Sequence, residues 1–198
     1  MTSPNIEVGY YNESRFTRPR PTCPNPGHWH TRDIQATEIE VVDMVHGMIR
    51  GLQPDVVLET GTSRGFMTFR IAQALLQNDH GVVVTFEPDP AVRVEALENW
   101  GDHPARDVIS SCDVGSLDVQ WTGGPIDFAW HDSLLELRVP EFDYYLPFYS
   151  NRAVVCFHDT APKFGSWSNE LRQRLQEEGF SWLDMPTPRG CIVARRNL

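Results

Sequence analysis

The sequence predicts a single α/β domain with a doubly wound, mostly parallel seven-stranded sheet and an antiparallel hairpin at its C-terminal end. Short apolar runs alternate with stretches of helical period along most of the 198 residues. Strands that alternate with helices form a parallel sheet with helices on both faces. Ligands bind to such sheets at the carboxyl ends of the strands, where the strand order reverses. We therefore expect the functional residues directly after the strands.

The elements follow from apolar periodicity and from the residues that interrupt it. The first helix is expected from near Asp33 to Gly51, with an apolar face in which only Glu38 is polar. Strands are expected at residues 56–58, 82–86, 108–112, 126–130 and 153–157. Helices are expected from residue 66 to a break at 78–81, at 91–100, in part of 141–149, and at 168–178. Residues 181–183 and 191–194 flank two prolines and a glycine, which predicts the closing hairpin.

Residues 1–30 differ in composition from the rest of the chain. Five of the fifteen prolines lie there, and proline is excluded from helix interiors and from central strands. We expect an extended arm or lid over residues 1–30, followed by a cofactor-binding domain over residues 31–198.

Charge and cysteine content narrow the class of protein. The formal net charge is −10, which disfavours nucleic acid as a partner because phosphate binding depends on Lys and Arg. The four cysteines are widely spaced and form no CxxC pair, so a disulfide framework is not expected. No apolar run approaches the roughly 18 residues of a membrane span. We expect a cytoplasmic protein with no membrane association.

A glycine-containing turn follows the first expected strand and reads Glu59-Thr60-Gly61-Thr62-Ser63-Arg64-Gly65. Glycines allow a sharp turn and a close approach of the backbone to a ligand. The helix that follows points its N-terminus at that ligand, which suits a carboxylate. The spacing differs from the Gly-x-Gly-x-x-Gly dinucleotide pattern, and no phosphate-loop Gly-Lys-Ser/Thr follows.

An acidic residue, Glu87, directly follows the second expected strand. A carboxylate at this place can accept hydrogen bonds from both hydroxyls of a ribose, as in dinucleotide folds. A solvated loop carboxylate is the alternative. Together with the glycine turn, Glu87 favours ribose binding.

These motifs resemble those of class I S-adenosylmethionine-dependent methyltransferases, in particular the small catechol and caffeoyl-CoA O-methyltransferase-like group. "VVLETGTSRGFMTFRIAQAL" is similar to the first motif and "VVVTFEPDP" to the second, and the likeness extends over residues 31–160. The resemblance implies that Glu59, Gly61 and Gly65 hold the methionine part of the cofactor, that Glu87 holds the ribose, and that Asp113 lies on the adenine side. The cofactor contacts that we expect are Glu59, Gly61, Thr62, Ser63, Gly65, Glu87, Asp113 and His131.

Two neighbouring strands each end in a His-Asp pair, His131-Asp132 and His158-Asp159. These four residues are the candidate catalytic groups, because parallel strands bring their carboxyl ends to one edge. Two carboxylates suit Mg²⁺ or another divalent cation, which would orient and acidify the acceptor's hydroxyls. The resemblance places metal ligands at Asp132, Asp159 and Thr160.

The pattern departs from the metal-dependent relatives at two positions. Thr160 stands where they have asparagine, and Leu135 stands where a candidate lysine base occurs. Metal assistance therefore stays open, and His131 or His158 is the alternative general base, because imidazole titrates near neutral pH. A structural role for either histidine also stays open.

A zinc site is a weaker alternative in the proline-rich arm. Cys23, His28 and His30 offer ligand atoms, but their spacing matches no strong zinc pattern and a fourth ligand is not evident.

The sequence thus predicts a methyltransferase that transfers the methyl group of S-adenosylmethionine to a hydroxyl of a small molecule. Three alternatives stay open: metal-independent transfer to nitrogen, transfer to carbon or a sugar, and a non-catalytic cofactor-binding module. Homodimer formation also stays open.

Overall fold

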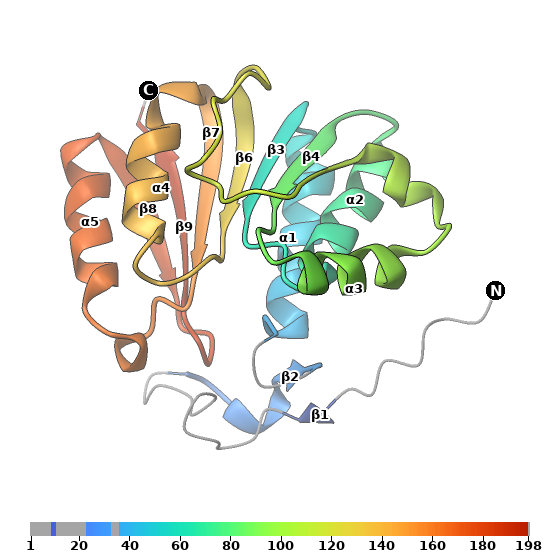
Figure 1. Ribbon diagram of the computed structural model, residues 1–198. Helices are drawn as coiled ribbons and strands as arrows, with labels where there is room; N and C mark the ends of the chain where they lie inside the picture. The colour runs from blue at the N-terminus through green and yellow to red at the C-terminus, as the bar shows by residue number, and fades with distance from the viewer. Residues whose placement is uncertain (1–8, 11–22, 33–35, 198) are drawn as a thin grey trace.

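A seven-stranded sheet forms the centre of the computed structural model, which describes residues 9–10, 23–32 and 36–197 (Figure 1). The strand order is β5-β4-β3-β6-β7-β9-β8. The strands are β3 (Val56–Thr60), β4 (Val82–Phe86), β5 (Ile109–Cys112), β6 (Ile126–His131), β7 (Tyr149–His158), β8 (Phe180–Met185) and β9 (Cys191–Arg196). Strands β5 to β7 in this order are parallel, whereas β9 pairs antiparallel with β7 and β8. The predicted fold class and closing hairpin are confirmed.

The strand order reverses at β3. From β3 the chain continues to β4 and β5 on one side, and then returns to β6 on the other side. The ends of β3 and β6 are level, because Thr60 is paired with His131. In a doubly wound sheet this reversal leaves a crevice at the carboxyl ends of the two strands.

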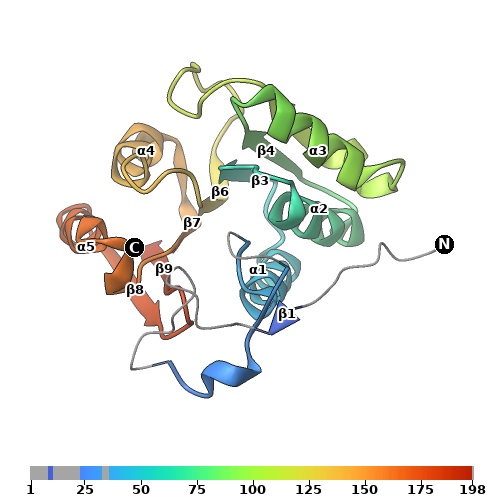
Figure 2. The same cartoon turned by 60° about the horizontal axis from the view of Figure 1, so that its bottom comes forward.

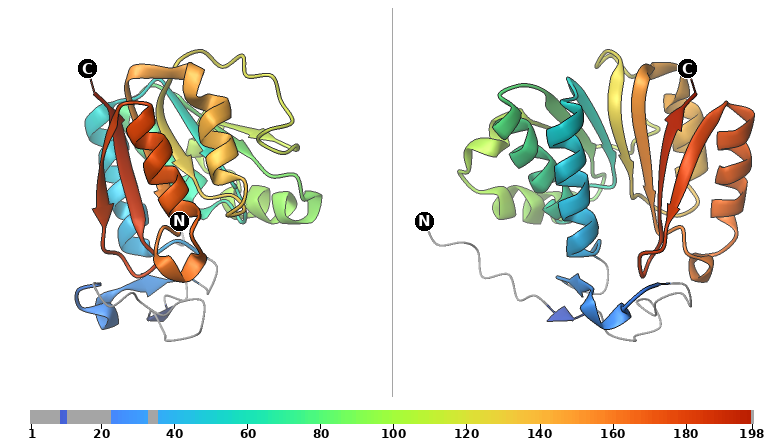
Figure 3. Two further views of the ribbon diagram at one scale, coloured as in Figure 1. Left: turned by 90° about the vertical axis from the view of Figure 1, so that its left-hand side faces the viewer. Right: turned by 180° about the vertical axis from the view of Figure 1, so that it is seen from behind.

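Helices cover both faces of the sheet, with α1 and α2 on one face and α4 and α5 on the other (Figures 2 and 3). The described residues form five α-helices, which are α1 (Ile39–Leu52), α2 (Phe66–Asn78), α3 (Pro90–Trp100), α4 (Arg138–Tyr145) and α5 (Trp167–Glu177). Short 3₁₀ turns cover Pro26–His28, Pro104–Val108, Leu146–Phe148 and Pro162–Phe164. Since α1, the longest described helix, has only 14 residues, none of them is long and apolar enough to cross a membrane.

Successive residues of the buried strands point into two different cores, because side chains alternate across a sheet. Val57, Phe128, Trp130 and Cys156 belong to the core beneath α1 and α2. Leu58, Ala129, Val155 and Phe157 belong to the core beneath α4 and α5. The side on which a residue near a strand end lies is therefore decided by its place in this alternation.

The boundaries of α1 differ from the sequence prediction. The expected start near Asp33 lies outside the described residues, but residues 36–38 are described and are not helical, so that the helix begins later than predicted, at Ile39. The predicted end at Gly51 was wrong, because the helix continues to Leu52. Gln53 ends it in a left-handed conformation (φ 49°) and donates its N–H to the Ile49 carbonyl at 3.0 Å.

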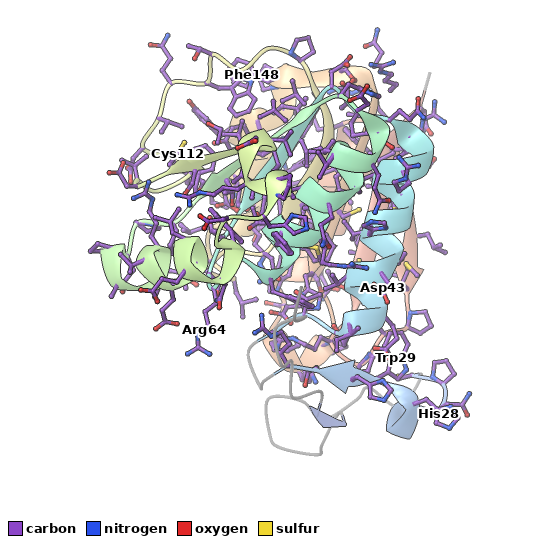
Figure 4. All side chains as sticks on the ribbon, turned by 90° about the vertical axis from the view of Figure 1, so that its right-hand side faces the viewer. His28, Trp29, Asp43, Arg64, Cys112 and Phe148 are labelled. Atoms are coloured by element: carbon purple, nitrogen blue, oxygen red, sulfur yellow. The ribbon has the colours of Figure 1, made fainter. Side chains whose placement is uncertain are left out.

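The described part of the N-terminal segment lies beneath α1 (Figure 1). Its strand β2 (His30–Thr31) pairs with β1 (Gly9–Tyr10), and Trp29 packs against the core beneath α1 and α2 (Figure 4). His30 is held by Glu40, with 2.6 Å between Nδ1 and Oε1. Among the described residues, the cysteine and histidines considered for zinc do not converge into a group at metal-binding distance.

The start of α3 gives a stability prediction. The Asp89 carboxylate caps this helix by accepting from the N–H groups of Ala91 and Val92 at 2.8 and 3.3 Å. We expect Asp89→Ala to lower the free energy of unfolding by about 1 kcal/mol, because these N–H groups lose their partner. Urea denaturation measures the change. Asp89→Asn is the control, since asparagine caps a helix as well as aspartate does; equal losses in both variants would contradict the capping role.

Candidate active site

The turn after β3 is shaped by three residues with positive φ. Gly61, Ser63 and Gly65 have φ of 89°, 48° and 75°. A Cβ on Gly61 would lie 2.5 Å from the Asp132 carbonyl oxygen, and one on Gly65 would lie 2.4 Å from Nε1 of Trp100. Both glycines are thus required by close approach as well as by backbone conformation. The turn presses directly against the ends of β6 and α3.

Glu59 lies beneath this turn and not on a surface open to a ligand. Its side chain is fully buried, and its Oε2 accepts from the hydroxyls of Thr68 at 2.5 Å and Thr85 at 2.7 Å. Its Oε1 has no hydrogen-bond partner among the described residues. Burial raises the pKa of Glu59 to about 8, although the two hydroxyls act in the opposite direction. In this structure Glu59 ties β3, α2 and β4 together.

Glu87 lies beside the glycine turn, at the end of β4. Its Oε2 accepts from the backbone N–H of Ser63 at 2.9 Å, and its Oε1 accepts from the N–H of Asp89 at 3.1 Å. The carboxylate is thereby held in one orientation on the rim of the turn. Asp113 follows β5 and is exposed.

A cavity of about 700 Å³ opens at the carboxyl ends of β3 and β6, where the strand order reverses. Its lining comprises Arg32, Ala36, Thr37, Gly61, Thr62, Ser63, Arg64, Phe66, Met67, Asp132, Ser133, Arg138, Asp159 and Arg189. Five of the residues predicted from the sequence are therefore on its wall: Gly61, Thr62, Ser63, Asp132 and Asp159. The others, which are Glu59, Gly65, Glu87, Asp113, His131, His158 and Thr160, lie behind the wall or beside it.

Two buried arginines bind the carboxylates of Asp132 and Asp159. Arg138, the first residue of α4, donates from Nη2 to Asp132 Oδ1 at 2.9 Å and to Asp159 Oδ2 at 3.3 Å. Arg189 forms a two-pronged pair with Asp159, with distances of 2.5 and 2.8 Å. Asp159 itself has a left-handed backbone (φ 58°), which aspartate tolerates better than most residues. Together, the guanidinium groups hold the ends of β6 and β7 at a fixed separation.

His158 and Glu38 complete this charged cluster. The imidazole of His158 is fully buried and donates from Nε2 to Glu38 Oε2 at 2.7 Å and from Nδ1 to Asp132 Oδ1 at 3.2 Å. Burial alone would lower the pKa of His158, but the charges of Asp132, Asp159 and Glu38 raise it to about 10. For Asp159, the effect of burial is outweighed by His158 and the two arginines, which hold the pKa of its carboxyl below its usual value. The raised pKa favours the cationic form of His158, which disfavours the predicted use of this residue as a general base.

Three side chains at the ends of β6 and β7 offer ligand atoms for a divalent cation. Asp132, His158 and Asp159 converge, with ligand atoms within 4.8 Å of one another. However, His158 donates both ring N–H groups, and each oxygen of the two aspartates accepts a hydrogen bond from Arg138, Arg189, His158 or Thr37. Metal ligation requires a neutral imidazole, and a dication would have to compete with the guanidinium groups that already bind the two carboxylates. The residues present do not fit a cation.

Thr160, the third expected metal ligand, is enclosed by the loop before β9. A Cβ on Gly190 would lie 2.8 Å from its Oγ1, and this buried oxygen has no hydrogen-bond partner among the described residues. Thr160 does not line the cavity.

The two His-Asp pairs are alike in sequence, but their histidines face opposite sides of the sheet. His131 is paired in register with Phe157, so that His158 lies one residue beyond it along β7. His131 stacks on Phe157 at a centroid distance of 4.9 Å, on the side of α4 and α5. His158 instead lies beside Trp130, which belongs to the core beneath α1 and α2. The structure does not bring the two imidazoles together.

His131 belongs to a separate buried network around Glu141. Its Nδ1 is 3.2 Å from the hydroxyl of Thr60, and its Nε2 is 2.8 Å from the hydroxyl of Tyr149. Glu141 accepts from Thr60 at 2.8 Å and from Ser133 at 2.7 Å. Burial would raise the pKa of Glu141, but His131 and the neighbouring hydroxyls lower it. His131 thus contacts Thr60 and Tyr149 behind the cavity wall, and it does not itself line the cavity.

Sequence reasoning missed Arg138, Arg189 and Thr37 as site residues, and it treated Glu38 only as an interruption of an apolar face. That interruption was the available signal, because a fully buried carboxylate requires a partner. Nothing comparable in the sequence marks the two arginines, and Arg189 lies 30 residues from the aspartate that it binds.

Comparison with known proteins identifies the family. A model of the methyltransferase domain family matches residues 58–160, which is more than half of the chain. No curated protein sequence matches this chain significantly. The chain belongs to the methyltransferase domain family and is a methyltransferase.

Solved structures share the fold at low identity. The O-methyltransferase TomG from Streptomyces achromogenes is 17% identical with a TM-score of 0.72, and the match covers 83% of this chain and 82% of that one. Rv0187 from MTB is 22% identical with a TM-score of 0.70, over 82% and 83% of the two chains. A putative caffeoyl-CoA O-methyltransferase from Staphylococcus aureus is 13% identical with a TM-score of 0.72, over 81% and 85%.

The charge on His158 gives a prediction for pH. Its pKa is raised from 6.5 to about 10, so its contribution to stability is fully present below about pH 6.5 and is lost as the pH rises through about 10. We expect its ring signals in NMR spectra, assigned with His158→Gln, to remain those of imidazolium from about pH 6 to about pH 8. A midpoint near 6.5 would show that the carboxylates do not hold the proton.

Proposed function

We propose that the protein is an S-adenosylmethionine-dependent methyltransferase whose acceptor is a hydroxyl of a small molecule. The observation that carries the proposal is the glycine turn, with Glu87 fixed on its rim, at the opening of a cavity of about 700 Å³. Two neighbours of the same fold support the choice of cofactor, since TomG is described in complex with SAM and the O-methyltransferase from Bacillus cereus in complex with SAH. Both are O-methyltransferases, which favours oxygen as the acceptor atom.

The cofactor's ribose is assigned to Glu87. Each of its carboxylate oxygens accepts one backbone N–H, which leaves lone pairs for the two ribose hydroxyls. The adenine would then extend toward Asp113, and the methionine part would extend over Gly61 toward α2.

The methionine carboxylate is assigned to Arg32 and the N-terminus of α2. The guanidinium of Arg32 lies 5.0 Å from the ring centroid of Phe66, the first residue of α2, and it lines the cavity. Among the described residues no carboxylate pairs with it, in contrast to Arg64, which pairs with Glu95 at 3.0 Å. A helix N-terminus with a cation beside it favours an anionic group.

Transfer to a hydroxyl breaks the bond from sulfur to the methyl group, forms a bond from that methyl group to oxygen, and releases one proton. The sulfonium supplies the leaving group, so the protein's contribution is orientation and removal of the proton. Asp132 is the proposed proton acceptor. Its side chain is 17% exposed, compared with 7% for Asp159, and its Oδ2 accepts only from Thr37 among the described residues. We also propose a cytoplasmic location, in keeping with four cysteines that are widely spaced and form no CxxC pair.

Cofactor binding can be measured without knowledge of the acceptor. We expect S-adenosylhomocysteine to bind in isothermal titration calorimetry, and Glu87→Ala to weaken binding by about 1–3 kcal/mol through the loss of hydrogen bonds to a charged acceptor. Glu98→Ala, on the exposed side of α3, is the control and should bind like the unmodified protein. Failure of the unmodified protein to bind would exclude the proposed cofactor.

The role of Arg32 can be separated from general effects with 5′-methylthioadenosine, which lacks the amino-acid part of the cofactor. We expect Arg32→Ala to weaken S-adenosylhomocysteine binding about tenfold, or ~1.4 kcal/mol, and to leave 5′-methylthioadenosine binding unchanged. Arg32→Lys should restore part of the loss, because it keeps the charge. An equal loss for both ligands would refute the assignment of the carboxylate.

A further inference from the structure

The guanidinium of Arg138 lies between the carboxylates of Asp132 and Asp159. It reaches Asp132 at 2.9 Å and Asp159 at 3.3 Å, and its side chain is only 2% exposed. It also donates to the carbonyl oxygens of Ser133, at 3.1 Å from Nε, and of His158. A single cation is therefore bound by oxygens from the ends of both β6 and β7.

We propose that Arg138 takes the place of a divalent cation between Asp132 and Asp159, so that the site forms and works without a metal. The charges support this. Glu38, Asp132 and Asp159 carry three negative charges, and Arg138, Arg189 and His158 carry three positive ones, all in direct contact. A cation of charge +2 added to this neutral cluster would have to displace one of its own cations.

The position of Arg138 on its helix also needs an explanation. Arg138 is the first residue of α4, and the helix dipole disfavours a positive charge there. Its guanidinium is further covered by the ring of Trp167, 5.2 Å from the centroid. The carboxylates of the two strand ends compensate for both the unfavourable dipole and the burial. The buried position of Arg138 is therefore stabilised by the carboxylates of Asp132 and Asp159 and not by its helix.

The replacement has a consequence for the acceptor. A bound divalent cation would favour substrates with two adjacent hydroxyls, because both can ligate it, and it would lower their pKa. A guanidinium already bound to two carboxylates does neither. We therefore expect an acceptor with one reacting group and no requirement for an adjacent hydroxyl pair. This consequence rests on the proposed function, whereas the binding of metal does not.

Binding of Mn²⁺ followed by electron paramagnetic resonance tests the proposal without the cofactor or acceptor. We expect the unmodified protein to leave Mn²⁺ free in solution, because Arg138 and Arg189 already neutralise the two carboxylates. Arg138→Ala should bind Mn²⁺ at one site at least about tenfold more tightly, since two carboxylates lose their shared partner. The double variant Arg138→Ala/Asp159→Asn should lose this gain.

Arg172→Ala is the matched control. Arg172 also binds a carboxylate with two prongs, at 3.0 and 2.7 Å, but among the described residues Asp184 is the one carboxylate with which it pairs. Its removal should produce no Mn²⁺ site. Binding of Mn²⁺ by the unmodified protein that disappears in Asp159→Asn would overturn the proposal, and so would a folded Arg138→Ala variant with no gain in binding.

If Arg138→Ala does not fold, the unmodified protein still decides the question. Free Mn²⁺, together with S-adenosylhomocysteine binding that chelator leaves unchanged, supports the proposal, whereas Mn²⁺ binding that depends on Asp159 refutes it. Calorimetry that shows no S-adenosylhomocysteine binding would refute the proposed cofactor while leaving the Mn²⁺ result valid. The two failures are thus distinguishable.

Discussion

Neutralisation of buried charge is the constraint on which the candidate site depends. Three carboxylates and three cations meet at the carboxyl ends of β6 and β7, and all six side chains are largely shielded from water. Removal of one partner from a buried pair typically costs about 3–5 kcal/mol, because a charge is left without compensation. The six residues come from the segment before α1, from β7, α4 and the loop before β9, and from the residues that follow β6 and β7. The six side chains therefore depend on one another for the compensation of their charges.

Most of the fold could be predicted because buried parallel strands leave a strong local signal. Residues 82–86 form β4 as expected, and the other strands differ from prediction mainly at their ends. The start of α4 could not be placed by the same means. The helix was expected within residues 141–149, whereas α4 begins at Arg138. Pro140 lies in its first turn, where the missing N–H has no helical partner to lose.

The site was predictable where its geometry is local. The glycine turn and Glu87 each depend on a few neighbouring residues, and the structure places them side by side, since Ser63 in the turn donates its N–H to Glu87. Their role toward a cofactor stays a prediction. The two His-Asp pairs were not distinguishable in the same way. Their difference arises from a one-residue offset in the register between β6 and β7, which sends His131 and His158 to opposite cores. The register between β6 and β7 and the placement of Arg138 and Arg189 beside the two aspartates are determined by the tertiary structure. They cannot be inferred from a single sequence.

Glu38 belongs to the segment that precedes α1, yet it accepts hydrogen bonds from His158 on β7 and from the backbone of Arg189 before β9. The carboxylate of Glu38, which precedes the first helix, thus binds His158 at the end of β7 and the backbone of Arg189 before β9. Without Glu38, Arg138, Arg189 and His158 would face only the carboxylates of Asp132 and Asp159. Contact between the two ends of the domain and compensation of charge in this cluster are consequently coupled.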